Sequence, residues 1–313
     1  MNHQPYDIIG DIHGYADVLE KLLRKLGYEK PAGTWRHPDG RKVLFLGDFI
    51  DRGPSIRRTL GTAKAMVDAG EALAIMGNHE YNALLYHTKG ADGDWLRRRV
   101  PKNVNQHAAT LAQFWNHRDE WEGYLAWFAT LPLWLDMGGL RAVHASWHDR
   151  LAANSEWQIL NGDLLHRSRV RNSLEFEHCE ILLKGPEAEL PAGAFFTDKE
   201  STVRTKMRLR WWLPAKGRTY HELCMPAPTQ TDEVPHEVVP ESVEALCPGY
   251  PADAPPLFFG HYWLPFDGKA GLITPNVACL DFSVAKDGAL FAYRWDGEQT
   301  LDAAKMVFAR EGE

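Results

Sequence analysis

The stretch VLFLGDFIDRGP, residues 43–54, decides the fold class of this chain. Its apolar residues 43–46 form an expected strand that stops at a glycine, and Pro54 suits the first turn of a helix running to about residue 69. The same order of strand, polar loop and helix recurs at residues 6–26 and from residue 72 onward. These repeats favour a sheet with parallel strands flanked by helices.

Polar side chains follow each of these strands directly. In sheets with parallel strands, ligands bind beyond the carboxyl ends, so we expect these loops to converge on one cleft. The loops are residues 10–14 (GDIHG), 47–53 (GDFIDRG) and 77–80 (GNHE), and two later strands, at 140–145 and 257–259, lead to His144 and His261.

The residue types in these loops indicate divalent metal ions. Their carboxylate, imidazole and amide groups are too many for one tetrahedral zinc and suit a pair of ions that share a carboxylate. Arg52 adds a planar fork of donors that suits phosphate. Any single loop is compatible with a solvated turn, but the joint occurrence at five strand ends favours a metal site.

The three loops resemble the signature blocks of the calcineurin-like metallophosphoesterases. More narrowly, the ending Asp51-Arg52-Gly53 resembles the phosphoprotein phosphatase branch, which includes bacterial serine/threonine phosphatases. The resemblance implies an α/β sandwich with central mixed sheets, flanking helices and a dinuclear metal site at the carboxyl ends of the strands. The motifs that carry this resemblance are concentrated in the first 80 or so residues, and beyond them only His144 and His261 take part in it.

The resemblance also implies a ligand set. Asp11 and His13 would hold the first ion, and Asp48 would bridge both. Manganese is the expected metal for activity in vitro, and iron, zinc and nickel are alternatives. The six implied ligands are Asp11, His13, Asp48, Asn78, His144 and His261.

The family pattern further implies the catalytic groups. His79 would be the general acid for the leaving oxygen, oriented by Asp51. Arg52, with help from Asn78, would bind the phosphoryl oxygens. The implied reaction is direct attack of a metal-bridging hydroxide, without a covalent intermediate. The branch uses a second phosphate-binding arginine, which the sequence leaves open among Arg167, Arg169, Arg171, Arg204, Arg208 and Arg210.

The substrate stays open at this point. Phosphoserine or phosphothreonine in proteins is the first expectation, and dinucleoside polyphosphates are the alternative. The symmetrical diadenosine tetraphosphate hydrolases tend to carry a different residue at the position of Asp51, which disfavours them. A nucleic-acid end phosphatase or cyclic phosphodiesterase is a third reading. A catalytically silent scaffold is disfavoured because every ligand position is filled.

We expect a single domain over residues 1–313 with two insertions. Residues 88–130 form a helical, tryptophan-rich insertion in which His107 is read as a helix-surface or core residue. Residues 186–256 hold 11 of the 19 prolines and form a loop-rich insertion.

Several basic segments have two readings. Residues 97–99 (RRR) fit either a contact to an anionic substrate or, preferably, a solvated helix face. Alternating cations at residues 206–210 lead into Trp211-Trp212, which fits a basic aromatic rim or a plain edge strand. Residues 184–187 (KGPE) either reach the cleft or form a turn.

Composition narrows the class of protein. The net charge of −7 argues against bulk binding of nucleic acid, so phosphate binding must be local. The longest apolar runs, such as residues 131–135, are too short to cross a membrane, and residues 1–10 lack the features of a signal peptide. A cytoplasmic enzyme with a phosphorylated substrate is expected, and no pattern specifies an oligomeric state.

Overall fold

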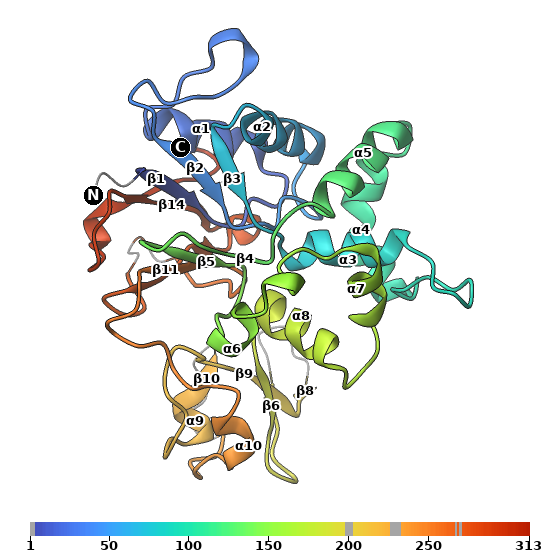
Figure 1. Cartoon of the computed structure of the whole chain (residues 1–313), viewed down its shortest axis with the longest axis vertical. Coiled ribbons are helices and arrows are strands. Elements are labelled where there is room, and N and C mark those ends of the chain that lie inside the picture. The colour runs from blue at the N-terminus through green and yellow to red at the C-terminus, as the bar shows by residue number, and fades with distance from the viewer. Residues whose placement is uncertain (1–3, 198–202, 226–232, 267, 269–270) are drawn as a thin grey trace.

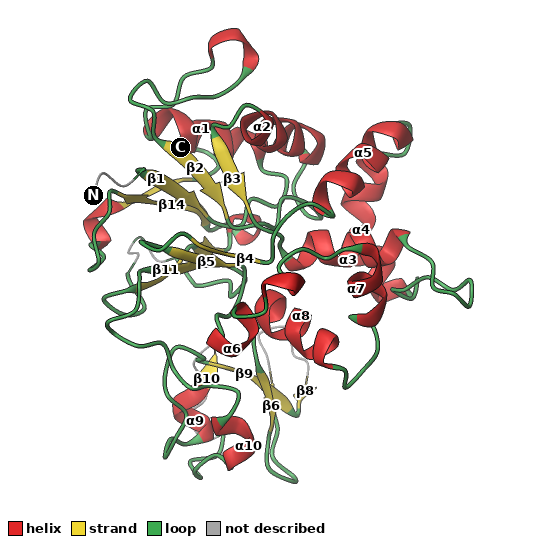
Figure 2. Ribbon diagram, viewed as in Figure 1, coloured by secondary structure: helices red, strands yellow, loops and turns green. Residues whose placement is uncertain are grey.

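Two stacked β-sheets with helices on their outer faces form the centre of the structure, a computed structural model (Figures 1 and 2). The first sheet has the order β13-β14-β1-β2-β3, with β15 paired to β14, and the second has the order β12-β11-β5-β4. The architecture is therefore a mixed α/β sandwich, as expected from the sequence. The structure describes residues 4–197, 203–225, 233–266, 268 and 271–313.

The early strands pair as the sequence predicts. β1 (Tyr6–Ile9) is parallel to β2 (Lys42–Phe45), which is parallel to β3 (Ala72–Ala74). The strands β13 (Asp281–Phe282), β14 (Ala289–Trp295) and β15 (Met306–Ala309) continue this sheet in antiparallel pairs.

The second sheet brings the two late histidines to the same edge. β5 (Arg141–Val143) and β11 (Leu257–Phe259) are parallel neighbours, β12 (Val277–Cys279) is parallel to β11, and β4 (Trp134–Asp136) is an antiparallel edge strand. The apolar stretch 277–282 contributes to both sheets, since β12 and β13 belong to different ones.

Alternation along the strands builds two hydrophobic layers. Ile8 and Leu44 point into the layer between the sheets, where they join Phe258. Their neighbours Ile9 and Phe45 point to the opposite face and join the helix-covered core. Successive strand residues face opposite sides of a sheet, so each sheet is apolar on both faces and is held in a fixed position.

Helices cover the outer faces of both sheets. α1 (Ala16–Lys25) and α2 (Ile56–Asp68) lie over the first sheet, and α3 (Asn78–His87) begins in the third polar loop (Figure 1). Further helices follow the second sheet: α6 (Asp149–Ala152), α7 (Gly162–Arg167) and α8 (Leu174–Lys184). Single turns of 3-10 helix occur at Pro31–Gly33, Ser155–Trp157, Val284–Lys286 and Ala303–Lys305.

The tryptophan-rich insertion contains α4 (Pro101–Gln113) and α5 (Arg118–Phe128). Trp121 and Trp127 pack into the helix-covered core, so the tryptophans of this insertion hold it against the sandwich. Residues 97–99 precede α4 instead of forming a helix face, so that expectation was wrong. Pro101 at the first turn of α4 explains the boundary, because proline disfavours helix in the residue before it.

The proline-rich segment is more ordered than expected. It contains a sheet of β6 (Glu187–Glu189), β9 (Lys206–Leu209) and β10 (Cys224–Met225), and a hairpin of β7 (Phe196–Thr197) and β8 (Val203–Arg204). It also contains α9 (Tyr220–Leu223) and α10 (Glu241–Glu244). The prolines obscured these short elements in the sequence, and residues 198–202 and 226–232 of the segment lie outside the described residues.

The Trp211-Trp212 pair is buried and does not form an aromatic rim. Their exposed fractions are 2% and 7%, and both rings pack against Phe259. The pair therefore anchors the small sheet to the central sandwich. Among the described residues, no helix is long and apolar enough to cross a membrane.

Candidate metal and phosphate site

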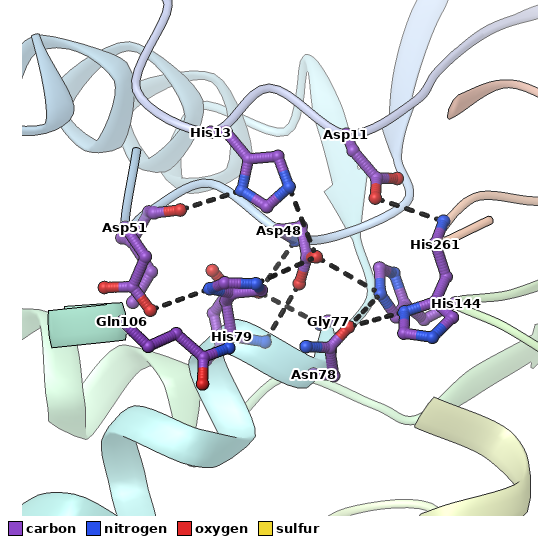
Figure 3. A network of polar contacts seen from close by, with 12 residues as sticks. Asp11, His13, Asp48, Asp51, Gly77, Asn78, His79, Gln106, His144 and His261 are labelled. Atoms are coloured by element: carbon purple, nitrogen blue, oxygen red, sulfur yellow. Dashed lines mark hydrogen bonds and ion pairs between the residues drawn. The ribbon is translucent and has the colours of Figure 1, made fainter. Parts of the chain in front are cut away.

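The polar loops converge at the carboxyl ends of the strands, as predicted (Figure 3). The two sheets are joined there: the backbone N–H of His261 donates to Asp11 Oδ2 at 3.1 Å. The backbone conformation is unusual, since four non-glycine residues of the site have positive φ: His13 (49°), Asp48 (51°), Asp51 (84°) and His261 (72°). Such conformations cost about 1–3 kcal/mol each and concentrate at functional sites.

Two glycines allow close approach of the backbone to the ligands. A Cβ on Gly77 would collide with Asp48 Oδ1, and a Cβ on Gly260 would collide with Asp11 Oδ1. Any larger residue at these two positions would displace the carboxylates. Glycine is therefore required there for steric reasons.

Asp48 lies between two groups of candidate ligands. Its Oδ2 is 3.6 Å from His13 Nε2 on one side and 3.5 Å from His144 Nε2 on the other. Potential ligand atoms of His13, Asp48 and His79 lie within 4.8 Å of one another, and so do those of Asp11, Asp48 and His144. Asp48 belongs to both groups, as a bridging carboxylate would. Asp11 groups with His144 and not with His13, its partner on the first ion in the set that the sequence implied.

Hydrogen bonds orient the imidazoles toward the centre of the site. Nδ1 of His13 donates to the carbonyl of Ile50 at 2.9 Å, and Nδ1 of His144 donates to the carbonyl of Leu46 at 2.8 Å. A carbonyl can only accept, so Nδ1 of each ring carries a proton and Nε2 is the nitrogen that faces Asp48. This arrangement is typical of metal-binding histidines.

Asn78 and His261 lie beside His144, which belongs with Asp11 and Asp48 to the second group of candidate ligands. Asn78 Oδ1 is 2.7 Å from His261 Nδ1 and 3.0 Å from His144 Nε2. All six expected ligands are thus brought together by the fold (Figure 3).

Unpartnered polar atoms show that the donor set fits divalent cations. Asp11 Oδ1, His13 Nε2 and His261 Nε2 are buried without a hydrogen-bond partner among the described residues. Burial, and next the charge of Asp281, raises the pKa of Asp11 well above its usual range. Burial also lowers the pKa of His13 to about 3, so this imidazole is neutral, the form that binds metals. Cations at this place would compensate the buried carboxylates and use the vacant lone pairs.

The pKa values of Asp48 and His144 also agree with a cation bound between them. Burial opposes ionisation of Asp48, but His144 and His79 outweigh it and hold the pKa of Asp48 well below its usual range. Burial likewise lowers the pKa of His144, but Asp48 raises it more strongly, to about 10. A cation between these two groups would take the place of the proton on His144.

His79 and Asp51 form the pair that the sequence predicted. His79 Nδ1 is 2.7 Å from Asp51 Oδ2, while the backbone N–H of His79 donates to Asp48 Oδ1 at 2.9 Å. Both side chains are buried. Burial lowers the pKa of His79, but Asp48 and Asp51 raise it above its ordinary value, which favours the protonated form that a general acid needs.

Arg52 lies beside the metal ligands and is held by an aromatic ring. Its guanidinium carbon is 4.1 Å from the ring centroid of Trp263, and its Nε has no hydrogen-bond partner among the described residues. Stacking on an aromatic face restrains the planar group while its N–H donors remain available. The sequence did not identify Trp263, whose position two residues after His261 is the only available signal.

Glu80 holds two of the polar loops together, a role that the sequence did not reveal. Its carboxylate accepts hydrogen bonds from the backbone N–H groups of Asp48 (2.8 Å), Phe49 (2.9 Å) and Gly77 (3.1 Å). It is fully buried, and burial followed by the charge of Asp48 raises its pKa to about 7. Glu80 therefore ties the second loop to the third.

We expect Glu80→Gln to destabilise the protein by about 1–3 kcal/mol, because the new amide group would turn a donor toward backbone donors. The urea midpoint of unfolding measures this change, with Glu29→Gln, at an exposed glutamate, as the matched control. Equal midpoints for the two variants would contradict the role of Glu80.

A basic cleft of about 2090 Å³ opens beside the site, with Asn78 and His261 in its lining. Ten lysine and arginine side chains line it, against five carboxylates, in a chain whose overall charge is −7. Residues 97–99 and 184–187 belong to this lining, so both segments reach the cleft, and the contact of residues 97–99 with an anionic substrate stays a prediction.

The structure narrows the choice of the second phosphate-binding arginine. Arg167 pairs with Glu175 at 3.0 Å, and Arg210 donates to the carbonyl of Cys224 at 3.1 Å. Arg169, Arg171, Arg204 and Arg208 line the cleft. Arg208 lies near the ligands: after burial, its charge is the next cause that lowers the pKa of His261, and its Nε lies 4.0 Å from Glu187 Oε1.

Comparison with known proteins identifies a family and several partial relatives. Residues 5–262 match the calcineurin-like phosphoesterase family. A protein named "Bis(5'-nucleosyl)-tetraphosphatase PrpE [asymmetrical]" from Geobacillus sp. (strain WCH70) is 48% identical over 73 residues, which are 23% of this chain and 30% of that protein. One of the same name from Halalkalibacterium halodurans is 46% identical over 74 residues, 24% of this chain and 30% of that protein. The chain therefore spans less than a third of the length of these relatives.

A solved protein serine/threonine phosphatase from Saccharomyces cerevisiae aligns with 100% of this chain and 82% of its own, at 14% identity and a TM-score of 0.48. That similarity is too low to bear on function.

Proposed function

Because this chain belongs to the calcineurin-like phosphoesterase family, we propose that it is a metal-dependent hydrolase of phosphoric esters or anhydrides that acts on nucleoside polyphosphates. The observation that carries the substrate class is the basic cleft that opens directly from the metal ligands. The names of the relatives point to the same class of substrate.

The residues of the site divide the chemical work. The six converging ligands would hold two divalent cations, which when bound would activate water and neutralise charge on the phosphoryl group. Arg52 would donate to the phosphoryl oxygens from its place on the Trp263 ring. His79 Nε2 would deliver a proton to the leaving oxygen while Asp51 holds Nδ1.

The size and charge of the cleft favour an extended anion. Pockets for small ligands typically measure about 300–1000 Å³, whereas this cleft measures about 2090 Å³. Its wall contains Arg99, whose guanidinium carbon lies 3.6 Å from the Trp95 ring centroid and 4.6 Å from that of Tyr86. Cations arranged along such a cleft suit the successive phosphates of a polyphosphate chain.

Asp51 does not count against this proposal. The sequence argument from Asp51 concerned symmetrical tetraphosphate hydrolases, whereas the relatives carry the asymmetrical name. A phosphoserine or phosphothreonine phosphatase is the second candidate, favoured by the Asp51-Arg52-Gly53 block and the bond between Asp51 and His79. We propose a cytoplasmic enzyme in either case, with manganese as the ion for assays in vitro.

Turnover of two substrates by manganese-loaded protein tests the proposal. We expect kcat/KM for diadenosine tetraphosphate to exceed that for a phosphoserine/phosphothreonine peptide by about a hundredfold, or about 2.7 kcal/mol of transition-state discrimination. The opposite preference would establish the second candidate. No turnover of either substrate, nor of a generic aryl phosphate, would reject the enzyme assignment.

Arg208→Met tests the phosphate contact in the cleft. We expect kcat/KM for diadenosine tetraphosphate to fall about ten- to a hundredfold, since one charged hydrogen bond is worth about 1.5–3 kcal/mol. Arg167→Met is the matched control, because Arg167 pairs with Glu175 outside the cleft. The advantage of wild type over Arg208→Met should also shrink as ionic strength rises. Equal effects of the two substitutions would exclude Arg208 as a phosphate ligand.

A further inference from the structure

Asp51 has partners on both of its oxygens, and only one of them is His79. Oδ2 is bonded to His79 Nδ1 at 2.7 Å, whereas Oδ1 lies 2.6 Å from His107 Nδ1 and accepts from the Thr110 hydroxyl, also at 2.6 Å. His107 and Thr110 are 1% and 0% exposed. They stand three residues apart on α4, so one face of that helix holds the carboxylate.

Thr110 also fixes the backbone of Asp51. The N–H of Asp51 donates to Thr110 Oγ1 at 3.1 Å, and the same hydroxyl donates to the Asp51 carboxylate. Asp51 has a φ of 84°, a conformation that a non-glycine residue keeps only when its surroundings enforce it. α4 supplies this restraint from an insertion outside the signature blocks.

The other ring nitrogen of His107, Nε2, lies against a second histidine. His107 Nε2 is 3.3 Å from His87 Nε2, and the same nitrogen of His87 accepts from the indole N–H of Trp121 at 3.2 Å. Indole N–H is a donor only, so His87 Nε2 is an acceptor and carries no proton. Burial first, and then the nearby His107, lower the pKa of His87 to about 4, which agrees with a neutral ring.

The hydrogen-bond pattern assigns a proton to Nδ1 of His107. Nδ1 must donate to Asp51, because an ionised carboxylate can only accept, and Nε2 lies 3.3 Å from His87 Nε2. The Asp51 carboxyl is ionised. Burial raises its pKa, but the hydrogen bonds from His107 and His79 lower the pKa by more than burial raises it, so that it lies below its ordinary value. His107 therefore links an anionic carboxylate to a neutral imidazole, and its ring lies beside those of Tyr86 and Trp121.

We propose that His107 is a positioning residue for the acid step: it locks Asp51 through a charged hydrogen bond, and Asp51 in turn aims the His79 ring at the leaving oxygen. The pair His79–Asp51 becomes a triad, His79–Asp51–His107, which His87 and Trp121 anchor to α3 and α5. This inference rests on the proposed function, because it concerns proton delivery in phosphoester hydrolysis.

Two polar variants of the same residue separate positioning from packing. His107→Asn keeps an N–H donor near the place of Nδ1, so it preserves the bond to Asp51. His107→Gln places its amide near Nε2, so it keeps a polar group of similar size but loses that bond. Phe114→Leu, at the buried end of α4, serves as the control for general damage to the helix.

The assay is kcat and KM of manganese-loaded enzyme for a series of substituted phenyl phosphates with leaving phenols of increasing pKa. Good leaving groups need no acid, so misplacing His79 should matter only for poor ones. We expect His107→Gln to lower kcat about ten- to a hundredfold for the poorest leaving group, with less than about a threefold change for 4-nitrophenyl phosphate and for KM. His107→Asn should lie within about threefold of wild type across the series.

Equal loss across the series in His107→Gln, as in Phe114→Leu, would overturn the inference and leave His107 a packing residue. Equal behaviour of the Asn and Gln variants would overturn it too. If wild type turned over neither an aryl phosphate nor diadenosine tetraphosphate, the proposed function would be rejected, and the inference with it, before any variant is compared.

Nitrogen-15 NMR of the metal-free protein gives a readout that does not depend on activity. Nδ1 of His107 should carry a proton in wild type, because it donates to Asp51. A His107 ring that carries its proton on Nε2 alone would contradict the bond to Asp51.

Discussion

Asp48→Asn is expected to lower kcat by about a thousandfold or more while the protein stays folded. Asp48 lies within 3.6 Å of His13 Nε2 and 3.5 Å of His144 Nε2, so a single carboxylate serves both groups of ligands. An asparagine keeps the volume and one oxygen, but its NH2 group would point a donor at one of the two cation positions.

Metal content measured by mass spectrometry, together with steady-state turnover, checks this prediction. The variant should bind fewer than two manganese ions per chain. Chelation should then lower the melting temperature of wild type more than that of the variant, since ligands that bind only the native state stabilise it. Asp287→Asn is the matched control, because Asp287 is exposed and also has a positive φ, 59°. Full metal content with normal turnover in Asp48→Asn would refute the shared-ligand role.

His79→Asn is expected to lower kcat about a hundredfold to ten-thousandfold for substrates with poor leaving groups. The asparagine side chain keeps an N–H donor for Asp51 near the place of Nδ1 but has no proton at the place of Nε2. The local structure around Asp51 should therefore persist while the acid is lost. Two metal ions should remain bound, which distinguishes this variant from Asp48→Asn.

The measurement compares an alkyl phosphate with 4-nitrophenyl phosphate. The variant should retain most of its kcat on the latter, because a good leaving group departs without a proton. A uniform loss on both substrates, or a loss of metal, would mean that His79 acts through the metal site and not as an acid.

The fold and the convergence of the candidate ligands could be predicted because their signals are local. An apolar run followed by glycine and a short polar loop specifies both a strand and what stands at its end, as in residues 43–53. The strands β1, β2 and β3 then need only parallel pairing to bring Asp11, Asp48 and Asn78 together. The proline-rich segment gave no such signal, because its strands have two to four residues and lie between turns.

His107 shows why other residues of the site escaped prediction. The spacing in residues 101–113 predicts a helix, and nothing local distinguishes a histidine that packs in the core from one that bonds to Asp51, 56 residues away. The arginines pose the same problem: sequence offers six equivalent candidates, and only the fold puts Arg167 outside the cleft and Arg208 inside it.

The sequence by itself determined the family-specific loops, the strand–helix order and the identity of the six expected ligands, since these depend on neighbouring residues and on backbone conformations that a few glycines permit. Only the tertiary structure decided which charges surround those ligands: the sharing of Asp51 between His79 and His107, the linkage of two loops by Glu80, and the basic cleft. The physical reason is the short range of the interactions involved. Hydrogen bonds and desolvation act between atoms within a few ångströms, and in this protein those atoms come from segments far apart in the chain.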